Sequence, residues 1–314
     1  MDDSGSKVCV YLGEELARYG FGEQHPFGND RMYAFQQEFE RRGLDRRARV
    51  LPPVSGSRAQ LALFHDSSYL DFLETRSREG SGFLDGGDTP AFRGVWEASL
   101  TVAGCVCDAA DRLLAGECRH AFVPIAGLHH ARRDGAAGFC AINDCDIVIE
   151  YLKQQGVGRI AYVDIDAHHG DGVYYAFESD SSVIIIDFHE DGRYLYPGTG
   201  AVTETGKGPA AGTKLNIPLP PEADDVLFSK LWPRAEAFLQ RYRPDFFILQ
   251  AGADSIAGDP ITHLELSART HARVARALAG MGDQPLLVLG GGGYNRANLA
   301  QAWSGVVEAL LDAA

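Results

Sequence analysis

Two aspartates and a histidine lie at every second position of the segment DIDAHHGDG, residues 164–172. Side chains alternate between faces in an extended chain, so Asp164, Asp166 and His168 would point the same way. The apolar run RIAYVDI, residues 159–165, leads into them and predicts a buried strand end. Two unpaired carboxylates there would repel each other and be poorly solvated, and a divalent cation removes that cost. The segment therefore predicts a metal site, with a solvated loop or an internal hydrogen-bond cluster as the alternatives.

A third metal ligand is predicted in the segment QAGADSIAGDP, residues 250–260. A catalytic zinc ion typically takes three protein ligands and leaves one position for water. Asp166 and His168 would supply two, and Asp254 is the best third candidate because it also lies just past an apolar strand. The alternative for Asp254 is a loop cap, and Asp259, which precedes a proline, is typical of a turn or a cap. Such a ligand set suits zinc, but it also suits iron(II) or cobalt(II).

The adjacent histidines His129 and His130, in GLHHARRDGAAGFC, could supply the acid and base chemistry that activation of water needs. Adjacent histidines can also be ordinary loop residues. The carboxylates of Asp164 and Asp171 are not needed as metal ligands, so they could orient the two imidazoles and raise their basicity. The small residues of GAAG, 135–138, would let the backbone approach a ligand closely.

A run of four glycines, residues 290–293, precedes Tyr294. Glycines permit a tight turn, which could aim the tyrosine back over the sheet edge. There its phenol could donate a hydrogen bond to a developing oxyanion. The alternatives are a phosphate cradle and simple packing of the ring, but GGGGYN lacks the GxGxxG spacing and the lysine of a phosphate-binding loop.

The elements that must position these residues form an alternating α/β pattern. Four segments are nearly continuous in apolar and β-branched residues, as expected for parallel strands covered on both faces: 159–165, 183–188, 246–250 and 285–290. Helical patterns lie at 94–115, 225–241 and 265–280, the last with Ser267 as a candidate cap. Open parallel sheets bind ligands at the carboxyl ends of their strands, where the polar residues lie, so we expect one shared pocket. We expect a single domain over residues 1–314.

The composition excludes some classes of function. The 314 residues include 29 Lys plus Arg against 43 Asp plus Glu, and the formal net charge of −14 argues against a nucleic-acid partner. The first residues lack the features of a secretory signal, and no apolar run approaches the ~18 residues of a membrane span. We therefore expect a cytoplasmic protein without a membrane partner. The six cysteines include no CxxC pair, which favours reduced thiols: Cys9, Cys105, Cys107, Cys118, Cys140 and Cys145.

Five motifs in order resemble the zinc-dependent histone deacetylase superfamily, which includes bacterial amidohydrolases and acetoin-utilisation proteins. They are HHARRDGAAGFCAIND, YVDIDAHHGDGV, YPGTG, GADSIAGDP and GGGGYN, and the resemblance runs from His25 to about Trp303. It implies an arginase-like fold, a three-layer α/β/α unit around a mostly parallel eight-stranded sheet. It also implies one catalytic Zn²⁺ ion.

The resemblance implies a role for each residue of the site. The metal ligands would be Asp166, His168 and Asp254. The catalytic groups would be His129 paired with Asp164, His130 paired with Asp171, and Tyr294, which would polarise the amide carbonyl. His130 would take the proton of the attacking water, with His129 as its electrostatic partner.

The resemblance also implies a substrate channel and a second ion. Gly138, Phe139 and Tyr196 would form the acyl-lysine channel, with Asp88 at its rim and Arg31 near an internal cavity. A structural K⁺ ion would lie near Asp164, Asp166, His168, Asp187 and Phe188, although many relatives have serine in place of Asp187. Cys140 would lie beside the channel, as a thiol that is either sensitive to oxidation or buried and inert.

The implied activity is hydrolysis of acylated lysine in proteins or peptides to acetate and free lysine. Ile261 stands where polyamine-specific relatives place a glutamate, and an apolar residue there offers nothing to a second ammonium group. One alternative is a hydrolase of acetylpolyamines or other small N-acetyl amines. Another is a weakly catalytic protein that binds acyl-lysine or a metabolite. An arginase-like ureohydrolase would need a second pair of carboxylates, which GADSIAGD does not provide. The sequence gives no expectation for the oligomeric state.

Overall fold

The centre of the structure is an eight-stranded sheet whose strands are all parallel, in the order β2-β1-β3-β8-β7-β4-β5-β6. It is seen in a computed structural model, which describes residues 7–22 and 25–314. The strands are β1 (Val8–Tyr11), β2 (Arg49–Leu51), β3 (His120–Val123), β4 (Ile160–Asp164), β5 (Val183–Glu190), β6 (Lys214–Leu219), β7 (Phe246–Gln250) and β8 (Leu286–Leu289). The predicted α/β class is confirmed, and so is the eight-stranded sheet that the family resemblance implies; its strands are all parallel rather than mostly parallel.

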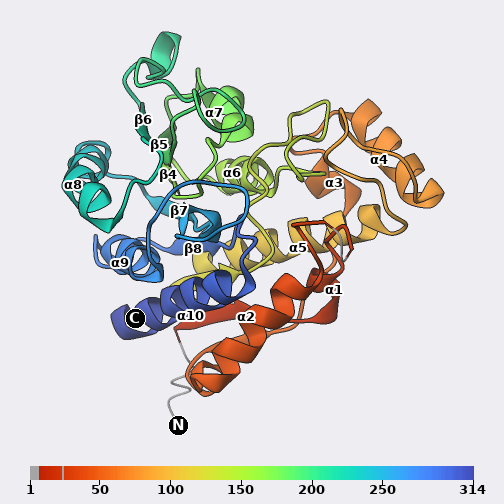
Figure 1. Ribbon diagram of the computed structural model, residues 1–314, viewed down its shortest axis with the longest axis horizontal. Coiled ribbons are helices and arrows are strands. Elements are labelled where there is room, and N and C mark those ends of the chain that lie inside the picture. Colours follow the sequence, from red (N-terminus) through yellow and green to blue (C-terminus); the bar gives the residue numbers. More distant parts are fainter. Residues whose placement is uncertain (1–6, 23–24) are drawn as a thin grey trace.

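Helices cover both faces of this sheet, as the three-layer prediction requires. Figure 1 shows α2, α9 and α10 packed together on one side and α5 and α6 on the other. The helices are α1 (Glu14–Ala17), α2 (Asp30–Arg41), α3 (Arg58–Leu61), α4 (Ser67–Glu79), α5 (Val95–Leu114), α6 (Asp144–Gln154), α7 (Asp171–Phe177), α8 (Asp225–Tyr242), α9 (Ala268–Ala279) and α10 (Arg296–Ala313), with 3-10 turns η1 (Leu44–Arg46), η2 (Gly208–Ala210) and η3 (Ala253–Ser255). No helix in residues 7–22 or 25–314 is both long and apolar enough to cross a membrane.

Several helices begin at the polar caps that their sequences offer. The side chains of Asn143, Asp224 and Asn295 accept backbone N–H groups at the starts of α6, α8 and α10. Ser267 does occupy the cap position of α9, but its side chain does not cap that helix. Its hydroxyl instead donates to Asp225 Oδ2 at 2.6 Å, which ties α9 to α8. The capping role predicted for Ser267 is therefore wrong.

The four strands predicted from the sequence lie side by side in the order β8, β7, β4 and β5. Every residue of these strands is buried, because helices cover both faces of the sheet. Their ends are in register, with Asp164 opposite both Gln250 and Asp187, and Gln250 opposite Leu289. The loops that follow these strands therefore all begin along one short stretch of the sheet edge.

Candidate active site

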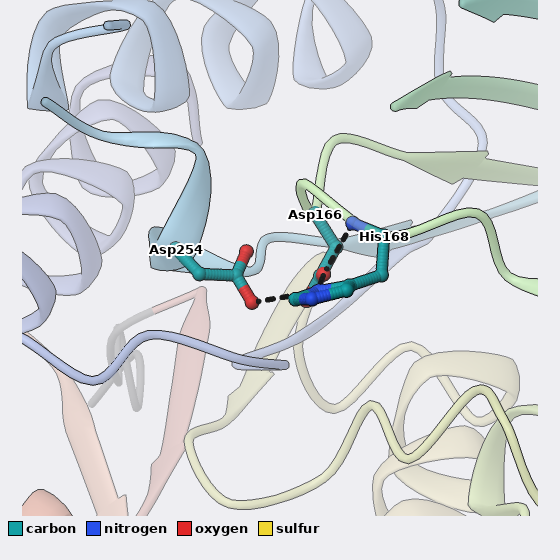
Figure 2. Close-up of side chains that lie close together, drawn as sticks. All are labelled: Asp166, His168 and Asp254. Atoms are coloured by element: carbon teal, nitrogen blue, oxygen red, sulfur yellow. Dashed lines mark hydrogen bonds and ion pairs between the residues drawn. The ribbon is translucent and has the colours of Figure 1, made fainter. Parts of the chain in front are cut away.

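Asp166, His168 and Asp254 meet at this edge, and Figure 2 shows their polar atoms facing one another. One ligand atom from each residue can be chosen so that all three lie within 4.8 Å of one another, and all three side chains are buried. The Nδ1 atom of His168 lies 3.0 Å from Asp166 Oδ1 and 3.2 Å from Asp254 Oδ2. Two of the residues follow β4, and Asp254 lies in η3 after β7.

The donor set fits a divalent metal ion. Asp254 Oδ2 is buried and has no described partner other than the His168 ring, whose Nδ1 lies 3.2 Å away, whereas Oδ1 accepts the N–H of Ala167 at 2.9 Å. Burial and the adjacent Asp166 raise the pKa of Asp254 to about 7. Burial disfavours the charged ring of His168, but hydrogen bonds to Asp166 and Asp254 outweigh it and raise the pKa of His168 to about 10. A proton on His168 thus bridges two crowded carboxylates, a position that a metal ion would suit better.

Asp164 does not join this cluster, in contrast to the prediction that Asp164, Asp166 and His168 face the same way. The strand β4 ends at Asp164, and the chain then bends so that Asp164 Oδ1 accepts the N–H of Asp166 and Asp166 Oδ1 accepts the N–H of His168. Asp164 Oδ2 turns instead to His129 Nδ1, at 2.8 Å. The alternation of an extended chain therefore does not continue beyond the strand.

The two histidines after β3 are each backed by a carboxylate. His129 Nδ1 lies 2.8 Å from Asp164 Oδ2, and His130 Nδ1 lies 2.7 Å from Asp171 Oδ1. The Nε2 atoms of the two rings are 3.0 Å apart. Burial opposes a charge on His129, but Asp164 and Asp166 raise its pKa to about 10. Burial and the neighbouring His129 lower the pKa of His130 to about 4, so His130 is the neutral member of the pair.

Tyr294 enters the site on the glycine run after β8. A Cβ atom at Gly292 would lie 2.1 Å from Asp254 Oδ2, so only glycine lets this backbone pass so close to the cluster. The Tyr294 N–H donates to Asp259 Oδ2 at 2.8 Å, while its hydroxyl makes no hydrogen bond with a described residue. Burial, Asp254 and Asp166 raise the pKa of Tyr294 well above its usual value, which keeps the phenol protonated. Asp259 is therefore more than the turn residue that its sequence predicts, because it also anchors Tyr294.

Aromatic rings lie beside this cluster, and one of them also lines a surface cavity. The Tyr196 ring is 5.1 Å from that of His130, and the Phe139 ring is 5.8 Å from that of Tyr294. Tyr196 lines a cavity of about 470 Å³ together with Asp85, Asp88, Arg132 and Gly138. Ile261 is half-buried in the loop after η3, where its N–H donates to Asp259.

Phe139 has a strained backbone that two hydroxyl groups hold. Its φ of 67° lies in the left-handed region, which costs a residue other than glycine about 1 kcal/mol. The Phe139 N–H donates to Thr89 Oγ1 at 3.1 Å, and its carbonyl accepts from the Tyr19 hydroxyl at 2.9 Å. Thr89 therefore connects the loop at the rim of the cavity to the wall beside Tyr294.

We expect Thr89→Val to lower the free energy of unfolding by about 1 kcal/mol, because the shape is kept while the Phe139 N–H loses its acceptor. Urea unfolding measures this change. Thr101→Val is the matched control, since its hydroxyl only adds a bond to the Glu97 carbonyl inside α5, and we expect a change within about 0.5 kcal/mol. Equal losses in the two variants would contradict the role given to Thr89.

Three other predicted residues lie around the cluster. Both oxygens of Asp187 accept hydrogen bonds within the protein, from His189 Nδ1 at 2.7 Å and from the Gly170 N–H at 2.9 Å. The potassium site that would include Asp187 and Phe188 stays a prediction. Arg31 is buried behind Tyr294, where it donates to the carbonyls of the glycine run. Burial raises the pKa of Cys140 well above its usual value, which favours the inert thiol over the reactive one.

Gln250 and Asp144 are site residues that sequence reasoning missed. The carboxylate of Asp144 accepts the N–H groups of Gly127 and Leu128, directly before the histidine pair. Gln250 hydrogen-bonds to Asp166 at 3.0 Å. Gln250 offered one signal, since it is the only strongly polar residue of an otherwise apolar strand, FFILQ.

Comparisons with known proteins agree with this geometry. A profile of the histone deacetylase domain matches residues 25–310. Histone deacetylase 19 of Arabidopsis thaliana is 36% identical over 307 residues, which cover 95% of this chain and 60% of that protein. Histone deacetylase RPD3 of Saccharomyces cerevisiae is 32% identical, with coverage of 95% and 70%. The acetoin utilization protein AcuC of Bacillus subtilis is 33% identical, with coverage of 88% and 75%.

A solved structure shares the whole fold. The crystal structure of the HDA15 HD domain superposes with a TM-score of 0.92 at 26% identity, covering 98% of this chain and 89% of that one. The family profile covers most of the chain and includes each motif that builds the site. The chain therefore belongs to the histone deacetylase family.

Proposed function

We propose that the protein is a zinc-dependent hydrolase that removes acetyl groups from lysine side chains of proteins or peptides, releasing acetate and free lysine. One observation carries this proposal. Three metal-ligand atoms that face one another lie beside two buried histidines, each with a carboxylate behind it. Metal-dependent hydrolysis of an unactivated amide uses both features, because the Lewis acid activates water and a base takes its proton.

Each residue then has a defined role. Asp166, His168 and Asp254 would hold the zinc ion, which when bound supplies Lewis-acid activation of water and of the amide carbonyl. His130 takes the proton of the attacking water at Nε2 and delivers a proton to the departing lysine amine. Asp171 supports this role because it accepts from Nδ1, which leaves Nε2 as the basic atom.

Two further groups act on charge that develops during the reaction. The Tyr294 hydroxyl donates to the oxygen of the tetrahedral intermediate, and its lack of another hydrogen-bond partner among the described residues supports this role. Such a donor contributes about 3 to 4 kcal/mol in acyl transfer. The Nε2 atom of His129 lies 3.0 Å from that of His130, and His129 is paired with Asp164. His129 therefore stabilises the change in charge on His130 as the proton is transferred.

Acyl-lysine is favoured over acetylpolyamine as the substrate. The rings of Tyr196 and Phe139 lie beside His130 and Tyr294 and suit a linear alkyl chain, which both substrates have, so the choice between them rests on Ile261. Ile261 offers no carboxylate to a second ammonium group. Relatives named histone deacetylase 19 and acetoin utilization protein match this chain at similar identity, 36% and 33%.

The test compares release of acetate from acetyl-lysine peptides and from acetylspermidine, with and without a chelator. We expect turnover of the peptides to exceed that of acetylspermidine, to stop on chelation and to return when zinc is added. Turnover that chelation leaves untouched would exclude the metal-dependent mechanism. A preference for acetylspermidine would overturn the argument from Ile261, and acetate release from neither substrate would favour a binding protein.

A further inference from the structure

Gln250 ends β7 at the middle of the sheet edge, and its side chain is fully buried. The strand β7 lies between β8 and β4, so the loops that carry Tyr294, Asp166 and Asp254 all start beside this residue. A buried carboxamide costs stability unless its donors and its acceptor are all used. Those of Gln250 are all used, and every partner belongs to the candidate site.

One contact of Gln250 fixes a metal ligand. Its Nε2 atom donates to Asp166 Oδ2 at 3.0 Å, and the Gly292 N–H donates to the same oxygen at 2.9 Å. With Oδ2 held by two donors, the other oxygen of Asp166 is the one that faces His168 Nδ1. Gln250 therefore determines which way the Asp166 carboxylate points.

The other contacts of Gln250 reach the two neighbouring loops. Nε2 also donates to the carbonyl of Gly127 at 3.1 Å, two residues before His129. Oε1 accepts the N–H of Gly252 at 2.7 Å, two residues before Asp254. One planar group thus connects the loop of the histidine pair, the loop of Asp166 and the loop of Asp254.

No other side chain can make this set of contacts. Glutamate has no amide donors and would place a second carboxylate beside Asp166, asparagine is one methylene shorter, and methionine has the length but no donor. A Cβ atom at Gly291 would lie 2.5 Å from both polar atoms of the Gln250 side chain, so the backbone closes over the carboxamide and leaves it no other position.

We propose that Gln250 is a positioning residue that sets both the orientation of the Asp166 carboxylate and the spacing between the metal ligands and the histidine pair. The inference rests on the proposed function for its link to turnover. Its link to metal binding depends on geometry alone.

The experiment measures zinc affinity of Gln250→Met and Gln250→Asn, starting from metal-free protein and using competition with a chromophoric chelator. We expect zinc Kd to rise about 10- to 100-fold in both, the range found when a partner of a metal ligand is lost. With saturating zinc we expect kcat for an acetyl-lysine peptide to remain at least ~10-fold low, with KM unchanged, because the spacing to the histidines is not restored. Zinc Kd within threefold of the wild type in both variants would overturn the proposal, as would full recovery of kcat in zinc.

Asn216→Asp is the matched control. Asn216 is another buried carboxamide, on the edge strand β6 opposite Asp187, and its Nδ2 donates to the Glu204 carbonyl and to none of the metal ligands. We expect this control to lower the unfolding temperature without changing zinc Kd. If wild-type protein binds zinc but releases no acetate from peptides, the proposed function fails while the comparison of zinc Kd still decides the role of Gln250. If the Asp254→Asn variant binds zinc as tightly as the wild type, the bound zinc lies elsewhere and the role of Gln250 is excluded.

Discussion

Asp254→Asn is expected to weaken zinc binding by more than ~100-fold and to abolish acetate release at ordinary zinc concentrations. The variant loses a buried carboxylate oxygen whose only described partner is another ligand residue, His168. Loss of a mere partner of a ligand already costs about 10- to 100-fold, so loss of a ligand should exceed that range. The same change should leave the metal-free protein as stable or more stable, because it removes a buried charge beside Asp166.

Two measurements check this expectation together. Titration calorimetry gives zinc affinity, and thermal unfolding with and without zinc gives the stabilisation that binding provides. We expect zinc to raise the unfolding temperature of the wild type and to have little effect on Asp254→Asn. Asp225→Asn is the control, since Asp225 holds Ser267 and Thr270 between α8 and α9 and should matter only for stability. An Asp254→Asn protein that still binds zinc tightly would remove Asp254 from the ligand set.

Tyr294→Phe is expected to lower kcat about 10²- to 10³-fold while zinc affinity stays within about twofold of the wild type. The substitution removes a single hydroxyl, which makes no hydrogen bond with the described protein and belongs to none of the three ligand residues. Folding should be unaffected for the same reason. The loss should appear in kcat rather than KM, because the hydroxyl acts on charge that exists only in the transition state.

Steady-state kinetics on an acetyl-lysine peptide, together with zinc analysis of the purified variant, separate these quantities. The control is Tyr242→Phe, whose hydroxyl donates to the Gly212 carbonyl at the other end of the sheet and should not affect turnover. Near-normal kcat in Tyr294→Phe would exclude Tyr294 from catalysis. Loss of zinc from this variant would show that the hydroxyl supports metal binding, and not only the transition state.

The sequence predicted the four central strands because each is an apolar run that needs no context to be recognised. The other four are weaker signals for physical reasons. The strand β2 has three residues and is half exposed at one edge, and β6 (KLNIPL) is a partly exposed strand at the other edge that contains a proline. The strands β1 (VCVY) and β3 (HAFV) include a cysteine, a histidine and an alanine, whereas β8, which is equally short, consists of leucine and valine alone and gives a clearer signal.

For the site, the residue types indicated metal chemistry, and the family motifs indicated which aspartate pairs with each histidine. Alternation along an extended chain placed Asp164 with Asp166, but local hydrogen bonds beyond the strand end decided otherwise. Neither Gln250 nor Asp144 could be assigned a role from the sequence. The Asp166 carboxylate that Gln250 contacts is more than 80 residues away along the chain. The partners of Asp144 are backbone N–H groups, which have no sequence signature. Contacts of these kinds leave no periodic trace in a sequence.

The strand order has a consequence for how the molecule is made. The strand β8 is the last of the eight to leave the ribosome, yet it inserts between β3 and β7 in the interior of the sheet. Until it arrives, the three strands on one side of its place, β2, β1 and β3, have no hydrogen-bonded connection to the four on the other side, β7, β4, β5 and β6. A nascent chain that has exposed every acidic ligand therefore still lacks both the continuous sheet and Tyr294, so completion of the site waits for β8 and the glycine run that follows it.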